Sequence, residues 1–387
     1  MEGKRFSKVD CIMKTQKITT NKQTKASEPK LTRTLIKDIR EGHIAGNVRS
    51  ELYDVQQYYL TPERQERLKS MGWFRRWFCR LVWITKALIF KLSPLRRILL
   101  VLSLICSISI QSKVGDGSSG FTLNSNFFGY FLLMLVVALE LKDKLIARDE
   151  LELGRKVQHS LLPVENPKIA NWDIWLYTTS ANEVGGDLVD YIKFMDGWLG
   201  VTIGDVSGKG LGAALLMAKL QASIKALTRI EVNSTEMIKH LNRIFCEDVP
   251  ASNFASLIYI KLSSDDKRVD LINAGHMPPL FYKQKKLHEL EHNNPALGMI
   301  KDVQFDEQSI EMEANDVLFL YSDGLSEARN ADHELFGEER ISKLIMQCAE
   351  LDVKKMAEKI LDTVKRFVGN ERMTDDLSFI IIKRVAS

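Results

Sequence analysis

The sequence is poor in cysteine, and its cysteines lie too far apart to form a local redox or metal motif. The 387 residues include five cysteines, at positions 11, 79, 106, 246 and 348. No two of them form a CxxC pair, and an odd number cannot complete a disulfide framework. Because disulfides persist in oxidising compartments, we expect this chain to work in a reducing one.

Several catalytic signatures are also absent. The sequence has no GxSxG, HExxH or GxxxxGK[ST] run, which argues against an elbow-type serine hydrolase, a zinc protease and a P-loop nucleotidase. No apolar run follows the first basic residues, so the sequence predicts no secretory signal. Of the seven histidines, only His276 has a suggestive place, within Asn273–Pro279. Its glycine and proline neighbours favour a structural turn, with a role near a reaction site as the alternative.

Charge is distributed unevenly along the chain. Residues 1–97 carry 22 Lys and Arg against 9 Asp and Glu, a net charge of +13, whereas the remaining residues carry 32 against 41, a net charge of −9. A basic segment can bind nucleic acid or flank a membrane on its cytoplasmic side. No nucleic-acid recognition motif is evident, so we expect no nucleic-acid partner.

The first 94 residues divide into two parts. Residues 1–30 are polar and rich in Lys and Thr, which predicts a disordered basic tail. Residues 31–94 show apolar positions at helical spacing, which predicts a helical basic region. Its cluster Trp73, Phe74, Trp77 and Phe78 is interleaved with arginines, as in a helix at a membrane interface. A small soluble helical domain is the alternative.

Two apolar runs, Ile98–Ile110 and Phe127–Leu139, follow this basic region. Each is shorter than the roughly 20 residues that an average membrane span needs. Lysines and arginines flank the pair on its outer sides, and the loop Gln111–Asn126 is rich in Gly and Ser. This arrangement predicts a two-helix membrane hairpin at residues 95–141 with both chain ends in the cytoplasm. The location would then be the cytoplasmic membrane; a cytoplasmic chain with two buried helices is the alternative.

The rest of the chain divides into a linker and a large domain. Residues 140–163 are charged with leucines among the charges, which predicts a linker helix that can pair with a second copy to form a homodimer. Residues 164–387 alternate strand-like runs with helices that do not follow every strand, which favours an α+β fold. We expect strands at Trp172–Tyr177, Trp198–Ile203, Phe254–Ile260, Val269–Ile272, Val317–Tyr321 and Leu377–Ile382. We expect helices at Leu211–Leu227, Ser234–Cys246 and Val353–Phe367.

Four short acidic motifs lie at the ends of these strand-like runs. They are Gly185–Asp190 (GGDLVD), Gly204–Gly210 (GDVSGKG), Tyr321–Glu327 (YSDGLSE) and Thr374–Ser378 (TDDLS). A single Asp followed by Gly is often a simple turn. Four such motifs in one domain, with no matching set of His or Cys, instead favour a site for a hard cation such as Mg²⁺ or Mn²⁺. Two such metals can bind a phosphate oxygen and activate water, which suits phosphoester hydrolysis.

The order and content of these motifs resemble the SpoIIE/RsbU-like bacterial branch of the PPM family, the metal-dependent serine/threonine protein phosphatases. The resemblance runs from about Leu151 to the C-terminus and includes the lead-in Val157–Pro163, followed in order by GGDxxD, GDVSGKG, NAGHMPPL, LYSDGLSEA and DDLSFI. The first 150 residues are not covered. The resemblance implies a PPM-type two-sheet β-sandwich flanked by helices over about residues 165–387, with metals at one end.

The resemblance also implies the cofactors and their ligands. Two divalent cations, Mn²⁺ or Mg²⁺, would be bound. Asp205 would bridge both, and the carbonyl of Val206 would bind one of them. Asp323 and Asp375 would complete the coordination of the other metal, and Asp187 would bind a metal directly or through water.

Further positions follow from the same motifs. Asp376 is adjacent to Asp375, and the sequence leaves open which of the two reaches a metal. Gly186, Gly208 and Gly324 would shape the backbone around the cations. Lys209 departs from the family, which often has His there, but no metal-binding carboxylate is lost.

The implied substrate is a phosphoserine or phosphothreonine on a signalling partner protein. Members of this branch usually act on anti-sigma-factor antagonists, the small phosphorylated proteins of partner-switching pathways. The alternative is a catalytically silent, membrane-attached signalling scaffold with the same fold. Because every carboxylate is retained, we expect an active enzyme.

Overall fold

The computed structural model describes residues 62–107, 111–114, 121–194, 197–230, 233–250, 252–291 and 293–385. The chain divides into two compact units, residues 1–140 and 141–387. The predicted disordered tail at residues 1–30 lies outside the described residues, as does the part of the predicted helical basic region before residue 62. Each unit is considered by itself.

The first unit is helical. Its elements are α3 (Pro62–Lys69), α4 (Trp73–Lys91), α5 (Pro94–Ser107), the strands β1 (Gln111–Val114) and β2 (Phe121–Asn124), and the first part of α6 (Ser125–Leu161). Helices α5 and α6 pack closely, since a Cβ atom at Gly129 would lie 2.8 Å from the backbone oxygen of Ser103. Arg96 of α5 also forms a 2.8 Å ion pair with Glu140 of α6.

The membrane hairpin predicted at residues 95–141 receives no support from these helices. None of the described helices combines the length and the apolar character that a membrane crossing requires. Helix α5 has only 14 residues, about 21 Å at 1.5 Å per residue, and the hydrocarbon core is about 30 Å thick. The described ends of the predicted loop, β1 and β2, pair as antiparallel strands.

The second unit contains two antiparallel five-stranded sheets. One has the order β10-β7-β6-β5-β4 and the other the order β3-β12-β11-β8-β9. The strands of the first sheet are β4 (Leu188–Lys193), β5 (Trp198–Val206), β6 (Ala255–Ser263), β7 (Arg268–Ala274) and β10 (Gln308–Glu311). Those of the second are β3 (Trp172–Thr179), β8 (Leu280–Lys283), β9 (Lys286–Glu289), β11 (Val317–Tyr321) and β12 (Leu377–Arg384).

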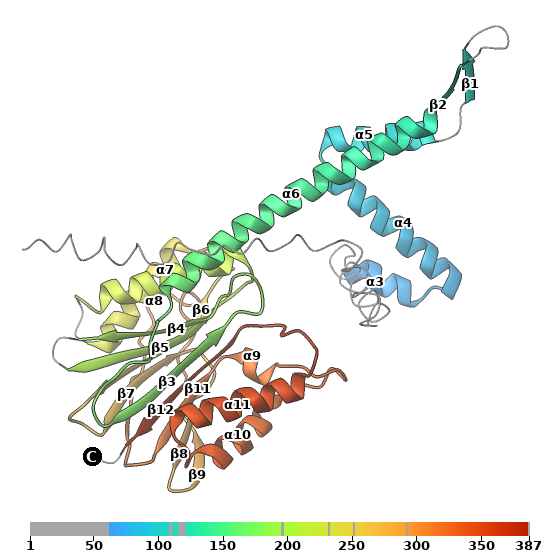
Figure 1. The fold of residues 1–387 in the computed structure, drawn as a ribbon. Helices are drawn as coiled ribbons and strands as arrows, with labels where there is room; N and C mark the ends of the chain where they lie inside the picture. Colours follow the sequence, from blue (N-terminus) through green and yellow to red (C-terminus); the bar gives the residue numbers. More distant parts are fainter. Residues whose placement is uncertain are drawn as a thin grey trace, which may run out of the picture. The chain divides into compact units, whose positions relative to one another are not determined.

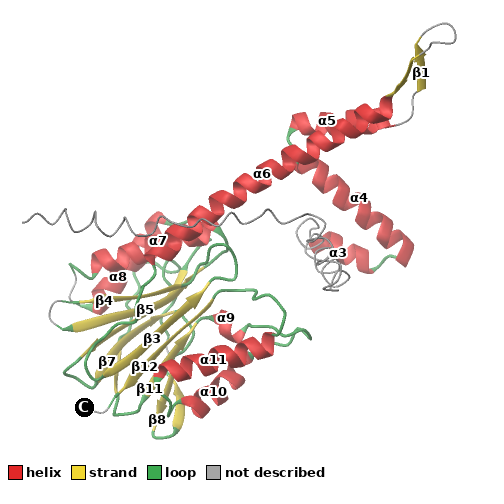
Figure 2. Ribbon diagram, viewed as in Figure 1, coloured by secondary structure: helices red, strands yellow, loops and turns green. Residues whose placement is uncertain are grey.

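Helices cover the outer face of each sheet (Figures 1 and 2). Helices α7 (Leu211–Leu227) and α8 (Ser234–Asp248) share a buried apolar cluster with the first sheet. Helices α10 (Gly337–Cys348) and α11 (Val353–Val368) share another with the second sheet. The short helix α9 (Asp323–Ser326) follows β11 directly. The unit is therefore a four-layer sandwich with two sheets at its centre.

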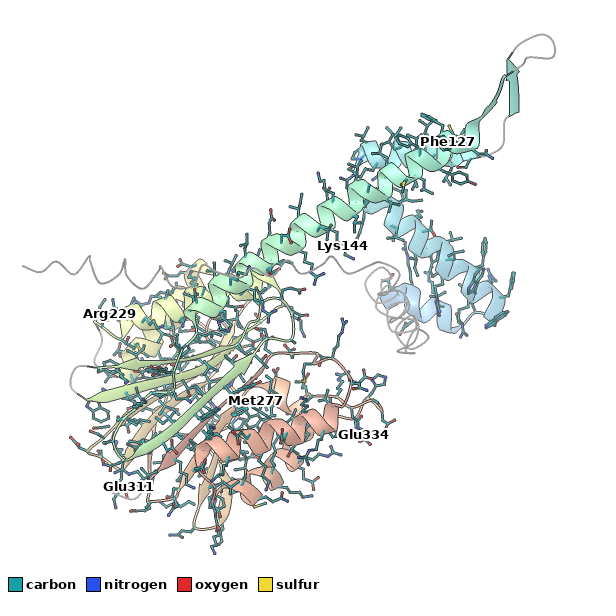
Figure 3. The ribbon with its side chains drawn as sticks, in the orientation of Figure 1. Phe127, Lys144, Arg229, Met277, Glu311 and Glu334 are labelled. Carbon is teal, nitrogen blue, oxygen red and sulfur yellow. The ribbon has the colours of Figure 1, made fainter. Side chains whose placement is uncertain are left out.

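Strand periodicity explains why both faces of each sheet are apolar. Side chains of a strand alternate between faces. In β12, Ile380 and Ile382 join the cluster between the sheets, while Phe379 and Ile381 join the cluster beneath α10 and α11. Side chains fill the space between the layers (Figure 3). The predicted α+β sandwich of two sheets with flanking helices is confirmed.

Candidate active site

The four acidic motifs meet at one end of the sandwich. Asp187 immediately precedes β4 and Asp205 is the second-last residue of β5, its antiparallel neighbour. Asp323 follows β11 and Asp375 lies just before β12, which are also antiparallel neighbours. The charges of Asp323 and Asp375 act on Asp205, which ties the two pairs together across the sheets.

Asp205 lies at the electrostatic centre of this group. Burial, followed by the charges of Asp323, Asp375 and Asp376, raises the pKa of Asp205 to about 7. Burial and then the charge of Asp375 also raise the pKa of Asp323. Like charges held close together disfavour the ionised form of each carboxyl group. A bound divalent cation would relieve this repulsion.

Asp187 and Asp376 are the most buried of the predicted carboxylate ligands. The exposed fraction of Asp187 is 6%, and burial, then the charge of Asp205, raises its pKa well above the ordinary value, against hydrogen bonding from Ser378. Its Oδ2 atom is buried and has no hydrogen-bond partner among the described residues. Since buried polar atoms are nearly always paired, this oxygen marks a place for a ligand.

Backbone from two motifs closes around Asp205. A Cβ atom at Gly186 would lie 3.1 Å from Asp205 Oδ1 and 3.1 Å from the carbonyl oxygen of Val206. A carboxylate oxygen and a carbonyl oxygen therefore face the same small space, and only glycine leaves that space open. Gly208 has φ +106°, a left-handed conformation that turns the chain toward Lys209.

The adjacent carboxylates Asp375 and Asp376 have different partners. Asp376 is buried and accepts hydrogen bonds from the backbone amides of Ala181 at 2.9 Å and Gly186 at 2.7 Å. Its own backbone oxygen packs against Gly324, where a Cβ atom would collide with it. Asp375 is more exposed and its Oδ2 is 2.7 Å from the ammonium group of Lys209. Asp376 therefore holds the loop at residues 181–187, and Asp375 is the better candidate for a metal ligand.

Lys209 already balances part of the negative charge. Its Nζ atom donates to Asp375 and, at 3.1 Å, to the carbonyl oxygen of Thr374. The hydrogen bond to Asp375 is the main cause of the raised pKa of Lys209. Metal binding by Asp375 would require this ammonium group to move away.

The residues fit a hard divalent cation by their chemistry. Within the described part of the chain, no three Asp, Glu, His or Cys side chains are already arranged to hold a metal. The candidate donors are nevertheless all oxygens: the unpaired Oδ2 of Asp187, the carboxylate of Asp205 and the carbonyl of Val206. Mg²⁺ and Mn²⁺ prefer such oxygen donors. The ligand assignments remain predictions of the sequence.

Gln158 gains a role that the sequence did not predict, whereas His276 has its expected one. Gln158, near the end of α6, donates to the carbonyl of Gly185 at 2.6 Å and accepts from its amide at 3.1 Å. In the sequence, Gln158 stands out only as part of the lead-in Val157–Pro163, which does not show what its side chain contacts. His276 is buried with Nδ1 2.8 Å from Ser256 Oγ, and its backbone amide donates to Asn273, in agreement with the structural role expected of it.

Sequence comparison places these motifs among known proteins. Residues 195–385 match the family described as stage II sporulation protein E (SpoIIE). The phosphoserine phosphatase RsbU of Bacillus subtilis is 27% identical over 239 residues, which cover 61% of this chain and 70% of RsbU. The phosphoserine phosphatase RsbP of the same organism is 29% identical over 247 residues, 62% of this chain and 59% of RsbP.

Solved structures agree on the fold. The SiaA-PP2C domain of Pseudomonas aeruginosa superposes with a TM-score of 0.55 at 16% identity, covering 63% of this chain and 99% of that domain. The RsbU and RsbW domains of a Mycobacterium tuberculosis protein give a TM-score of 0.52 at 24% identity, covering 58% of this chain and 63% of that one. Residues 195–385 are therefore a domain of the SpoIIE type, homologous to the phosphoserine phosphatases RsbU and RsbP, and the second unit has the PP2C-type fold.

Proposed function

We propose that the chain hydrolyses phosphoserine or phosphothreonine on a partner protein with the help of two divalent cations, Mn²⁺ or Mg²⁺. The observation that carries this proposal is the gathering of Asp187, Asp205, Asp323 and Asp375 from four separate segments at one end of the sandwich. Bound cations would supply charge neutralisation and the activation of water for attack on the phosphoester. The two named relatives RsbU and RsbP are phosphoserine phosphatases, which supports the same substrate chemistry here.

The protein's own residues divide this work. Asp205, Asp323 and Asp375 would hold the cations, and Asp187 would add an oxygen from the buried side. Asp376 fixes the loop that carries Asp187 through backbone amides. A groove of about 740 Å³ lies next to Asp323 and is also lined by Met277, Glu327 and residues 335–340. It offers room for the residues that flank the phosphorylated side chain.

The test is phosphate release by the full-length chain from p-nitrophenyl phosphate and from a phosphoserine peptide. We expect turnover with Mn²⁺ or Mg²⁺, none with EDTA, and a loss of at least about 100-fold in Asp205→Asn, since even residues that only support metal ligands are worth 10–100-fold. Glu358→Gln, which changes an exposed acid on α11, is the matched control. Metal binding without turnover would favour the silent scaffold instead.

The proposed partner is a small phosphoprotein of the anti-sigma-factor antagonist type, as in partner-switching pathways. Its support is the family membership of residues 195–385. The measurement is loss of phosphate from such antagonist proteins encoded in the same genome, each phosphorylated by its own kinase. Equal, slow turnover of all of them and of an unrelated phosphoprotein would contradict this assignment.

We also propose that the protein forms a homodimer through residues 140–160. This part of α6 exposes apolar side chains, among them Leu145, Leu153 and Val157, and exposed apolar stripes on a helix favour pairing. Light scattering should give twice the mass of 44.2 kDa, and Leu153→Lys with Val157→Lys should reduce it to the monomer value. A monomeric wild-type protein would contradict the dimer.

For location, we propose attachment to the inner face of the bacterial cytoplasmic membrane, with the catalytic domain in the cytoplasm. The support is helix α4, which exposes Trp73, Phe74 and Trp77 beside arginines and resembles a helix that lies in a lipid interface. Flotation with anionic and with neutral vesicles tests this. Binding to neither vesicle would favour the cytoplasmic alternative.

A further inference from the structure

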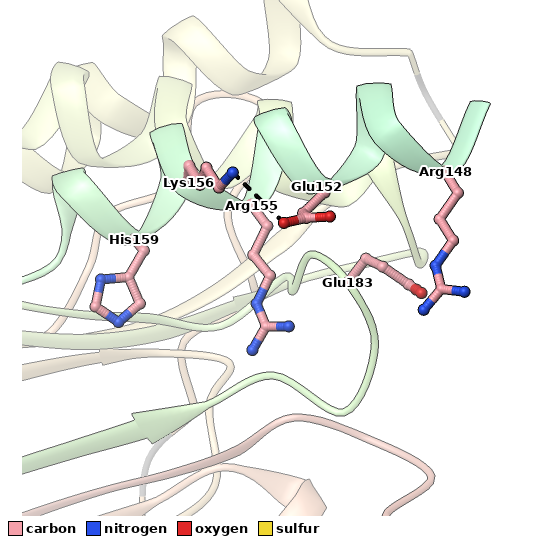
Figure 4. Close-up of a pocket in the computed structure, with 6 residues that line it drawn as sticks. All are labelled: Arg148, Glu152, Arg155, Lys156, His159 and Glu183. Atoms are coloured by element: carbon pink, nitrogen blue, oxygen red, sulfur yellow. Dashed lines mark ion pairs between the residues drawn. The ribbon is translucent and has the colours of Figure 1, made fainter. Parts of the chain in front are cut away.

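A cationic pocket lies between helix α6 and the loop before Asp187. It has a volume of about 390 Å³ and is lined by Arg148, Glu152, Arg155, Lys156, His159 and Glu183. All of these residues except Glu183 belong to α6 (Figure 4). The whole pocket lies within the second unit. None of its residues is part of the carboxylate group described above.

The two arginines and His159 lie along one face of the helix. Arg148, Arg155 and His159 are seven and four residues apart, and residues at these spacings share a helix face. Arg148 and His159 are eleven positions apart in the helix, about 16 Å at 1.5 Å per residue. About five residues of an extended peptide cover the same length. The pocket is therefore shaped for a segment rather than for a single ion.

The two guanidinium groups are available to a partner. Lys156 is paired with Glu152 at 3.4 Å. Arg148 and Arg155 have no hydrogen bond or ion pair to any other described residue, and both are exposed. Guanidinium groups present paired donors that match carboxylates and phosphates. An anionic segment would thus meet two free donors on one face of α6, two turns apart, with Glu152 and Glu183 between them (Figure 4).

The second unit as a whole is acidic, unlike this pocket. Residues 141–387 contain 31 Lys and Arg against 39 Asp and Glu, a net charge of −8. The groove beside Asp323 is lined by three further acids, Glu327, Glu338 and Glu339, and by two bases, Arg340 and Lys343. An acidic partner is repelled over most of such a surface and is oriented by the cationic part of it.

The pocket is also close to the carboxylates. Glu183 precedes Asp187 by four residues, so their Cα atoms are at most about 14 Å apart. The same loop is joined to α6 through the two hydrogen bonds between Gln158 and Gly185. A peptide with its phosphoserine at the carboxylates can therefore reach the pocket within a few residues.

We propose that this pocket binds an acidic segment of the phosphoprotein substrate and so selects substrates with acidic residues near the phosphorylated side chain. The proposal rests on the proposed phosphatase function. Arg148 and Arg155 are its specificity-determining residues, and Glu183 limits the pocket on the loop side.

The test uses synthetic phosphoserine peptides and the full-length protein with Mn²⁺. Two peptides carry four glutamates a few residues before or after the phosphoserine, and their partners carry glutamines instead. For the better-placed glutamate peptide we expect a KM about fivefold lower than for its glutamine partner, since exposed ion pairs contribute modestly. Raising the salt concentration should shrink this difference, because salt screens exposed charges.

Variants test whether the preference for glutamate peptides depends on the pocket. Arg148→Gln combined with Arg155→Gln should make the KM values of the glutamate and glutamine peptides equal, with kcat preserved. Lys354→Gln with Lys359→Gln, which removes two exposed cations from α11, should keep the preference. Equal KM values for both peptides in the wild-type protein would overturn the proposed pocket alone. No turnover of any peptide or of p-nitrophenyl phosphate would instead count against the phosphatase function.

Discussion

Two neighbouring aspartates at the site do different work, although the sequence makes them look equivalent. Asp376 is held by backbone amides of the loop at residues 181–187, whereas Asp375 faces Lys209. Hydrogen bonds to a buried charge are worth about 1.5–3 kcal/mol each, and exposed ion pairs about 0–1 kcal/mol. One carboxylate therefore contributes mainly to stability and the other mainly to the site.

This difference predicts opposite results for two substitutions. Asp376→Ala should lower the free energy of unfolding by about 2 kcal/mol or more, because buried amides lose their acceptor. Asp375→Ala should change it by less than about 1 kcal/mol but should weaken Mn²⁺ binding strongly. Urea unfolding in EDTA and calorimetric titration with Mn²⁺ measure the two effects. Equal losses of stability in the two variants would refute the division of roles.

The space beside Gly186 gives a second prediction. In Gly186→Ala the new methyl group would lie 3.1 Å from Asp205 Oδ1 and from the Val206 oxygen, so these oxygens must shift apart. We expect Mn²⁺ affinity to fall by about tenfold or more, the range found when the support of metal ligands is disturbed. Gly212→Ala is the control, because nothing lies within 4 Å of a Cβ atom there. An unchanged affinity in Gly186→Ala would show that this space holds no cation.

At the scale of elements, a buried side chain of helix α6 is hydrogen-bonded to the loop that precedes Asp187. Gln158 pairs with both backbone groups of Gly185. Gln158→Leu should lower the free energy of unfolding by about 2 kcal/mol, since both groups would stay buried without partners. Ser160→Ala, at an exposed position two residues later, should change it by less than about 0.5 kcal/mol. Denaturant titration compares the variants, and equal stabilities would contradict the link.

The strands beside the acidic motifs could be predicted from sequence because their signals are local. The runs expected at Trp198–Ile203, Val317–Tyr321 and Leu377–Ile382 all lie within observed strands, β5, β11 and β12. Apolar runs followed by Asp and Gly mark both the strand and its end. Strands β8, β9 and β10 have four residues each and were missed, because so short a run carries little periodicity.

Features that depend on distant contacts could not be predicted. The separate roles of Asp375 and Asp376 depend on the loop at residues 181–187, almost 200 positions away. The sequence also predicted an apolar run at Phe127–Leu139 and a separate linker helix from residue 140, but both belong to the single helix α6. No Gly or Pro interrupts residues 130–153, and in the absence of a breaker a helix continues through a change from apolar to charged residues.

At the scale of the whole molecule, the acid cluster should make the stability of the metal-free protein depend on pH. The pKa of Asp205 is raised to about 7 in the folded protein and is near 4 when unfolded. Between these values the folded state binds more protons, so the free energy of unfolding falls as pH rises. We expect the Tm in EDTA to drop from pH 5 to pH 8, and Asp205→Asn to flatten that slope. A Tm that rises over this range would contradict the assignment.

The central claim is that carboxylates from four segments hold cations at one end of the sandwich. The most direct measurement is the anomalous scattering of Mn²⁺ in crystals of the protein. We expect two manganese peaks beside Asp205, one of them contacted by the Val206 carbonyl and the other by Asp323 and Asp375, with Lys209 displaced from Asp375. A map without a peak at Asp205, in crystals that contain Mn²⁺ and with Lys209 still bound to Asp375, would contradict it.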